Sequence, residues 1–107
     1  MNEEKIKILT DLKISLSERF KDKLSELILF GSQLTDGVSK DSDYDILIIL
    51  KQKADWKLER EISDICYDID LKYGILTDTH VLSESELNSP RGRQPIFINA
   101  LSKGYYA

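Results

Sequence analysis

The sequence contains one cysteine, Cys66, and no long hydrophobic run. A single cysteine excludes an intrachain disulfide and any cysteine-rich zinc site. The longest apolar stretch, residues 46–50, is far shorter than the roughly 20 residues that a membrane-spanning helix needs. The chain also opens with polar residues rather than with the basic and apolar run of a secretory signal. We therefore expect a cytoplasmic protein that does not engage a membrane.

An excess of positive charge is missing as well. The chain has 15 Lys and Arg against 19 Asp and Glu, a net charge of −4. Non-specific binding to nucleic acid needs a basic surface that displaces counterions from phosphates. The charge argues against DNA or RNA as a direct partner and favours a single nucleotide.

The length of 107 residues is enough to bury one core, so we expect a single domain over residues 1–107. Apolar residues at helical spacing predict amphipathic helices over about residues 3–22 and from Asp55 to Gly74, with Asn2 and Asp55 as N-caps. Apolar runs predict strands at about residues 26–30, 44–50 and 75–82, and a short helix and strand close the chain. This order indicates an α/β (α+β) domain with a small mixed sheet and flanking helices.

The most informative motif is Gly31-Ser32, followed after ten residues by Asp43-Tyr44-Asp45. Gly31 and Ser32 come directly after an apolar run, so a buried strand ends where backbone N–H groups can approach an anion, and Ser32 adds a hydroxyl donor. A short helix that begins here, before a loop through Gly37 and Ser39, would point its unpaired N–H groups at the same place. This arrangement suits a triphosphate.

Asp43 and Asp45 lie two residues apart at the head of the strand at 44–50, so their side chains point to one face. Adjacent carboxylates repel each other unless a cation lies between them, and Mg²⁺ prefers oxygen ligands from carboxylates and phosphates. The alternative is a polar turn, because Asp and Ser are common turn residues. The fixed distance from Gly31-Ser32 favours a site for nucleotidyl transfer.

The spacing of these two motifs resembles that of the minimal nucleotidyltransferases (MNT domains) of the polymerase-β superfamily, and the likeness covers essentially the whole chain. The resemblance implies a polymerase-β-like fold and a third acid on a later strand, Asp78, which alternation puts on one face with His80. It further implies that Asp43, Asp45 and Asp78 are catalytic and hold one or two Mg²⁺ ions, and that Gly31 and Ser32 bind the triphosphate of ATP. The alternative for Asp78 is an edge strand with this carboxylate in water.

The chain departs from the family pattern after Gly31-Ser32. Family members often carry Arg next and Gly five positions along, whereas here those places hold Gln33, Thr35 and Asp36, and Gly37 comes one step late. Positive charge is thus missing near the predicted phosphates. Arg91 and Arg93 could reach phosphates from their loop, although solvated loop charges are the commoner outcome.

The predicted catalytic core uses the whole chain, so we expect the acceptor of the nucleotide to dock from outside. A chain with these features is similar to the antitoxin of bacterial HEPN/MNT toxin–antitoxin pairs. In these pairs an MNT domain adenylylates a tyrosine of a helical HEPN-family ribonuclease toxin. The resemblance thus implies transfer of AMP to a hydroxyl of such a partner. Two alternatives stay open: a catalytically silent module that acts by contact, and transfer to a small molecule such as an aminoglycoside, against which the chain's length counts.

Overall fold

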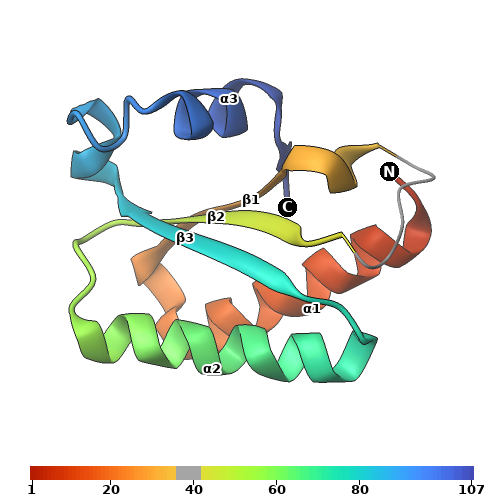
Figure 1. Ribbon diagram of the computed structural model, residues 1–107. Helices are drawn as coiled ribbons and strands as arrows, with labels where there is room; N and C mark the ends of the chain where they lie inside the picture. The colour runs from red at the N-terminus through yellow and green to blue at the C-terminus, as the bar shows by residue number, and fades with distance from the viewer. Residues whose placement is uncertain (36–41) are drawn as a thin grey trace.

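The computed structural model describes residues 1–35 and 42–107, in which four strands form one mixed sheet (Figure 1). The strands are β1 (Leu24–Phe30), β2 (Tyr44–Leu50), β3 (Thr77–Ser83) and β4 (Tyr105–Tyr106). Their order in the sheet is β3-β2-β1-β4. β2 and β3 are parallel, whereas β1 is antiparallel to both β2 and β4. The predicted small mixed sheet is confirmed.

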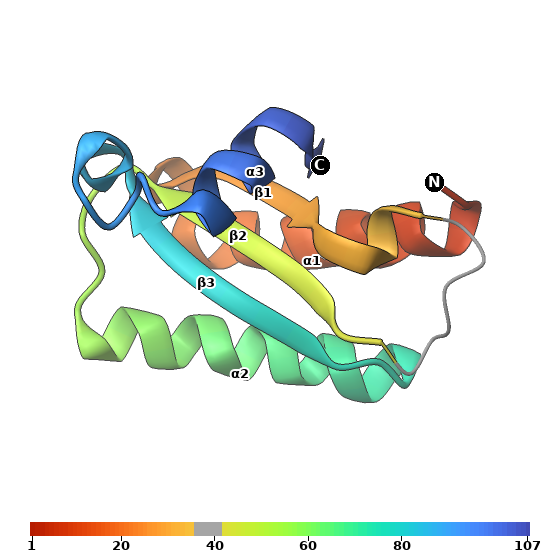
Figure 2. The same cartoon turned by 45° about the horizontal axis from the view of Figure 1, so that its top comes forward.

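Helices cover both faces of this sheet. Figure 1 shows the two long helices beneath the sheet and the short C-terminal helix above it, and in Figure 2 the first long helix lies behind the strands and the C-terminal helix in front of them. The helices are α1 (Glu3–Phe20), α2 (Trp56–Tyr73) and α3 (Pro95–Lys103), with 3₁₀ turns η1 (Lys21–Lys23), η2 (Gly31–Leu34) and η3 (Glu84–Asn88). The predicted α+β architecture with flanking helices is therefore confirmed. In the described part of the chain, no helix combines the length and the apolar character needed to cross a bilayer.

The ends of the long helices follow the capping signals of the sequence. The Asn2 side chain accepts a hydrogen bond from the Lys5 backbone N–H at 2.9 Å, and the Asp55 side chain accepts one from Leu58 at 2.8 Å. Gly74 ends α2 in the left-handed conformation, with φ of +66°. Each predicted cap is therefore confirmed. The caps stabilise the helices because they satisfy backbone groups that a helix end leaves unpaired.

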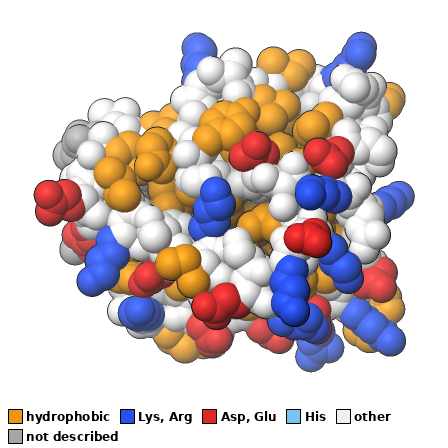
Figure 3. Space-filling model, turned by 180° about the vertical axis from the view of Figure 1, so that it is seen from behind, with side chains coloured by type: hydrophobic (Ala, Val, Ile, Leu, Met, Phe, Trp, Pro, Cys, Tyr) orange, Lys and Arg blue, Asp and Glu red, His pale blue; other side chains and the backbone are white. Residues whose placement is uncertain are grey.

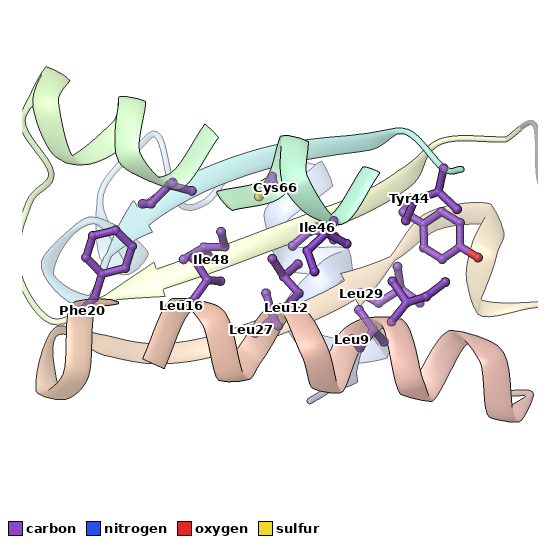
Figure 4. Packing of buried hydrophobic residues seen from close by; sticks show 14 of the residues in the cluster. Leu9, Leu12, Leu16, Phe20, Leu27, Leu29, Tyr44, Ile46, Ile48 and Cys66 are labelled. Atoms are coloured by element: carbon purple, nitrogen blue, oxygen red, sulfur yellow. The ribbon is translucent and has the colours of Figure 1, made fainter. Parts of the chain in front are cut away.

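Two apolar clusters lie on opposite faces of the sheet. The larger cluster lies between the sheet and the helices α1 and α2 (Figure 4). It includes Leu9, Leu12, Leu16, Phe20, Leu27, Leu29, Tyr44, Ile46, Ile48 and Cys66. The smaller cluster lies between the sheet and α3. It consists of Ile28, Phe30, Leu47, Ile49, Leu82, Phe97 and Ala100. Alternate residues of β1 and β2 enter alternate clusters, so these strands are buried on both faces.

Several boundaries differ from the prediction. β1 begins at Leu24 instead of residue 26, and β3 ends at Ser83 instead of residue 82. The first helix ends at Phe20 and continues as η1, and the helix expected after Gly31-Ser32 is only the 3₁₀ turn η2. The third strand begins at Thr77 instead of residue 75, because the N–H groups of Gly74 and Ile75 both donate to the Asp70 carbonyl in closing α2. The loop predicted through Gly37 and Ser39 lies outside the described residues.

Replacing Gly74 tests its role at the end of α2. No described atom lies within 4 Å of the place that a Cβ would occupy, so Gly74→Ala introduces backbone strain without a clash. We expect a loss of about 1 kcal/mol in the free energy of unfolding. Gly74→Asn is the matched control, and its loss should be smaller because Asn adopts this conformation more readily. Urea unfolding measures both, and equal stability of Gly74→Ala and wild type would contradict the assignment.

Candidate active site

The predicted phosphate cradle lies directly against one of the predicted acids. Phe30, at the end of β1, pairs with Asp45 of β2, and Gly31 follows with φ of +79°. A Cβ at Gly31 would lie 2.2 Å from Oδ2 of Asp45. Only glycine therefore allows the backbone to turn in this way and to approach the carboxylate so closely.

The three predicted acids lie where β2 and β3 begin, on the side of the sheet that α3 covers. Asp45 pairs in register with Asp78 on the parallel strand β3. Asp45 alternates with Leu47, and Asp78 with Leu82, both of which belong to the cluster beneath α3. Asp43 precedes the strand, and its charge acts on Asp45. The structure thus brings the three carboxylates into one neighbourhood.

The sequence left two interpretations of Asp78, a third acid of the site and a carboxylate in water on an edge strand. The position of Asp78 has features of both. β3 is an edge strand, and the Asp78 side chain is 53% exposed, as the solvated alternative supposed. Asp78 nevertheless lies opposite Asp45, so that an exposed and a partly buried carboxylate are side by side.

The electrostatics of this group centre on Asp45. Burial raises the pKa of the Asp45 carboxyl above its ordinary value, and the charge of Asp78 raises it further. His80 acts in the opposite sense, while Asp43 and a hydrogen bond with Asp78 add smaller increases. The site therefore disfavours the ionised form of Asp45 and would gain from a cation.

The residues present suit Mg²⁺ in part. Among residues 1–35 and 42–107, no group of three or more His, Cys, Asp or Glu side chains could hold a metal ion. Magnesium usually takes only one or two carboxylates and completes its shell with water and substrate phosphates. Crowded carboxylates beside a cradle for phosphate are a donor set of that kind.

Gln33 shows how the chain uses the position where relatives often carry Arg. Its side chain is fully buried, and its Nε2 donates to the Ser42 carbonyl at 3.0 Å. This bond ties η2 to the residue before Asp43. Ser32 is exposed on the same turn. Gln33 thus holds the backbone of the site together, whereas the sequence indicated only a missing charge.

Lys5 is a residue of this region that the sequence interpretation missed. It lies on α1 and is only 4% exposed, and its Nζ donates to the carbonyls of Gln33 at 2.8 Å and Thr35 at 3.1 Å. Lys5 therefore brings a buried positive charge behind the cradle. A signal was available, because Lys5 continues the helical spacing of the buried Leu9, Leu12 and Leu16.

His80 contacts the Asp78 carboxylate and two aromatic rings, whereas Arg91 contacts the backbone of β3. The His80 ring lies between Phe30 and Phe97, with centroid distances of 5.9 and 5.7 Å, and its Nε2 is 3.7 Å from Oδ2 of Asp78. Arg91 donates to the Val81 carbonyl at 3.3 Å. Arg91 thus lies along the edge of β3.

Comparison with known proteins agrees with this geometry. The sequence profile of the family described as "Nucleotidyltransferase domain" matches residues 9–101. The chain belongs to this family. Two proteins of Methanocaldococcus jannaschii, both named "Putative protein adenylyltransferase", are similar to it. MJ0141 is 38% identical over 68% of this chain and 74% of its own length, and MJ0604 is 32% identical over 82% and 81%. The chain is thus a nucleotidyltransferase.

Solved structures support the fold of this nucleotidyltransferase. Two crystal structures of mutants of the toxin–antitoxin complex MntA-HpeT contain a similar chain, with TM-scores of 0.61 and 0.57. The likeness covers 99% and 100% of this chain and 72% and 71% of the other, at 19% and 20% identity. The predicted nucleotidyltransferase fold, a small mixed sheet with flanking helices, is therefore confirmed.

The raised pKa of Asp45 predicts how its replacement changes stability. Since the carboxyl titrates above its ordinary range in the folded state, its stabilising contribution is complete at low pH and is lost as pH rises through the folded pKa. We expect Asp45→Asn to raise the melting temperature of the metal-free nucleotidyltransferase by a few degrees at neutral pH and by less near pH 4. Asp68→Asn, an exposed site on α2, is the control. An equal effect of Asp45→Asn at both pH values would contradict the electrostatic account.

Lys5→Met tests the buried cation beneath the cradle. The change keeps the length of the side chain but removes the donors to Gln33 and Thr35, which we expect to lower the free energy of unfolding by about 1–3 kcal/mol. Because η2 loses its support, KM for the nucleotide should rise more than kcat falls. Lys7→Met, at an exposed position of α1, is the matched control. Unfolding and steady-state kinetics measure the two effects, and an unchanged KM would limit Lys5 to a role in stability.

Proposed function

We propose that this nucleotidyltransferase transfers AMP from ATP to a hydroxyl of a partner protein, with a tyrosine of a HEPN-type toxin as the acceptor. The observation that carries the proposal is the approach of Gly31 to the Asp45 carboxylate, which puts an anion cradle next to acidic side chains. The names of both M. jannaschii relatives support a protein as the acceptor. The similar structures come from a toxin–antitoxin complex, which supports a toxin as the partner.

The reaction exchanges one phosphorus–oxygen bond for another. The acceptor oxygen bonds to the α-phosphorus, the bond from that phosphorus to the oxygen bridging to the β-phosphate breaks, and pyrophosphate leaves. The hydroxyl proton passes to a carboxylate, and Asp78 suits this role because it is the half-exposed acid of the strand pair. Gly31 and Ser32 bind and orient the triphosphate.

Asp43, Asp45 and Asp78 are the acids from which Mg²⁺ would take one or two carboxylates, with the substrate phosphates and water completing its shell. When bound, the metal would neutralise charge on the triphosphate and on the departing pyrophosphate. The raised pKa of Asp45 supports this role, because a cation would offset both the burial and the repulsion from Asp78 that raise it. We expect the reaction to take place in the cytoplasm, which supplies ATP and Mg²⁺.

The surface around α3 supports a macromolecular acceptor. In Figure 3, which views the molecule from behind, hydrophobic side chains gather over the upper part and charged side chains over the lower part. Ile96 is 43% exposed, Ile98 52% and Tyr106 45%, and the Tyr106 hydroxyl donates to the Leu101 carbonyl of α3. Apolar surface of this kind is typical of sites that bind another protein. It lies on the side of the sheet that carries the acids.

Labelled ATP tests the proposed transfer. We expect α-labelled ATP, but not γ-labelled ATP, to leave label on a tyrosine of a HEPN-type partner protein mixed with this chain. Chelation of divalent metal should abolish the transfer. Asp78→Asn should reduce the single-turnover rate by about 10² to 10⁴. Asp68→Asn carries the same change of charge on α2 and should leave the rate unchanged.

The alternatives give different results in the same experiment. If partner and chain bind each other but no label moves, the chain is a silent module that acts by contact. If aminoglycosides or simple alcohols accept AMP as well as the partner does, the acceptor is a small molecule. An unchanged rate for Asp78→Asn would remove Asp78 from catalysis.

A further inference from the structure

The outer edge of β3 is open. β3 is the last strand of the sheet on its side, and within the described residues it pairs only with β2. Figures 1 and 2 show β3 in front of the other strands, with no helix or strand across its outer edge. At the other end of the sheet, β4 covers β1 opposite Ile28 and Leu29.

The hydrogen-bond pattern shows which backbone groups face outward. The Tyr44 N–H donates to the Leu76 carbonyl at 2.8 Å, and Tyr44 is in register with Thr77. In a parallel pair this phase turns the N–H and C=O groups of Thr77, Thr79 and Val81 away from β2. Two contacts agree: the Thr77 N–H donates to Oδ1 of Asp70 at 3.1 Å, and the Val81 carbonyl accepts from Arg91.

The side chains of Asp70 and Arg91 thus satisfy the outward backbone groups at the two ends of this edge. The groups in the middle of the edge are left without such partners. Four outward groups remain between them: the Thr77 carbonyl, the N–H and carbonyl of Thr79, and the Val81 N–H. None of the four has a hydrogen-bond partner among the described residues. Such a row of unpaired groups matches the backbone of another extended chain.

The surface beside the open stretch has room for such a chain. One hollow of about 250 Å³ is lined by residues that include Glu59, Ser63, Thr79 and Arg91. A second, also of about 250 Å³, is lined by residues that include Ser63, Tyr67 and Thr79. Because both share Ser63 and Thr79, they form one groove between α2 and the edge of β3.

We propose that this edge of β3 binds an extended segment of the acceptor protein as an antiparallel strand centred on Thr79. The proposal rests on the proposed function and adds how the acceptor docks. An antiparallel residue opposite Thr79 would exchange two hydrogen bonds with it, and the residues two positions away would bond to Thr77 and Val81. Four hydrogen bonds would then hold a segment of five residues.

This pairing places a side chain of the partner beside the acids. The partner residue opposite Asp78 points to the same face of the extended sheet as Asp78, with its Cβ about 4.5–5.5 Å from the Cβ of Asp78. That face carries Asp45 as well. The segment that fits best is therefore extended and carries its hydroxyl residue one position after its centre.

A defined peptide tests the docking without ATP. The probe is acetyl-Thr-Val-Thr-Tyr-Thr-amide, in which the third residue would lie opposite Thr79 and the tyrosine opposite Asp78. In an NMR titration of the labelled protein, we expect saturable shifts of the Thr79 and Val81 amide signals. N-methylation of the third residue removes a hydrogen bond and should weaken binding at least about tenfold. N-methylation of the tyrosine is the matched control, because that N–H points away from β3.

Variants of the protein give a second measurement. Thr79→Pro removes the outward N–H without removing a bond to β2, so an edge strand tolerates it, and it should weaken peptide binding at least about tenfold. Thr79→Val loses only the hydroxyl and should bind as wild type does. If melting shows that Thr79→Pro does not fold, the pair of methylated peptides decides.

Separate outcomes distinguish the docking from the chemistry. Absence of saturable shifts at Thr79 and Val81, or equal binding of the two methylated peptides, would overturn the docking proposal. Transfer of AMP from ATP to the peptide tyrosine is measured in parallel. Binding without any transfer, to this peptide or to the partner protein, would count against the proposed function alone. Transfer at the same rate in folded Thr79→Pro would overturn the edge while the proposed function stands.

Discussion

The close approach of the Gly31 backbone to the Asp45 carboxylate is the constraint on which the site depends. It requires β1 to end where β2 begins, and the antiparallel register that pairs Phe30 with Asp45 provides this. The two-sided burial of both strands fixes the register, because a slip of one residue would turn Asp45 into the core beneath α1 and α2. The apolar core therefore fixes the geometry of a polar site at its margin.

The ionised form of Asp45 is disfavoured at this site. Burial together with neighbouring acids raises the pKa of the Asp45 carboxyl. Buried polar contacts support the adjoining turn from behind. Lys5 reaches from α1 to the carbonyls of the turn, and Gln33 ties the turn to Ser42. A carboxyl with a raised pKa beside a turn that the fold holds in place is typical of a functional site.

The two edges of the sheet differ. β4 covers part of the outer edge of β1, opposite Ile28 and Leu29. The edge of β3 is closed only at its ends by Asp70 and Arg91, although an open edge is a hazard for aggregation. The open stretch also carries Asp78. An edge that is left free beside the acids agrees with an acceptor that arrives from outside the domain.

The sequence by itself determined the features that depend on neighbours in the chain. Helical spacing and the caps Asn2, Asp55 and Gly74 predicted the long helices, and the apolar runs predicted the strands to within two residues. Gly31-Ser32 and the pair Asp43 and Asp45 marked the turn after β1 and the start of β2, which the structure brings together. These patterns succeed because a turn of helix or two residues of strand suffices to state which face a side chain takes.

Only the tertiary structure decided what depends on contacts between distant segments. It placed β3 at the edge of the sheet beside β2, so that Asp78 is both opposite Asp45 and half exposed. From the sequence these two properties had been alternatives. The tertiary structure also brought Lys5 to Gln33 and Thr35, which lie 28 and 30 residues away in the chain. A local pattern shows that Lys5 is on the buried face of its helix, but strand order and packing decide which backbone carbonyls it meets there.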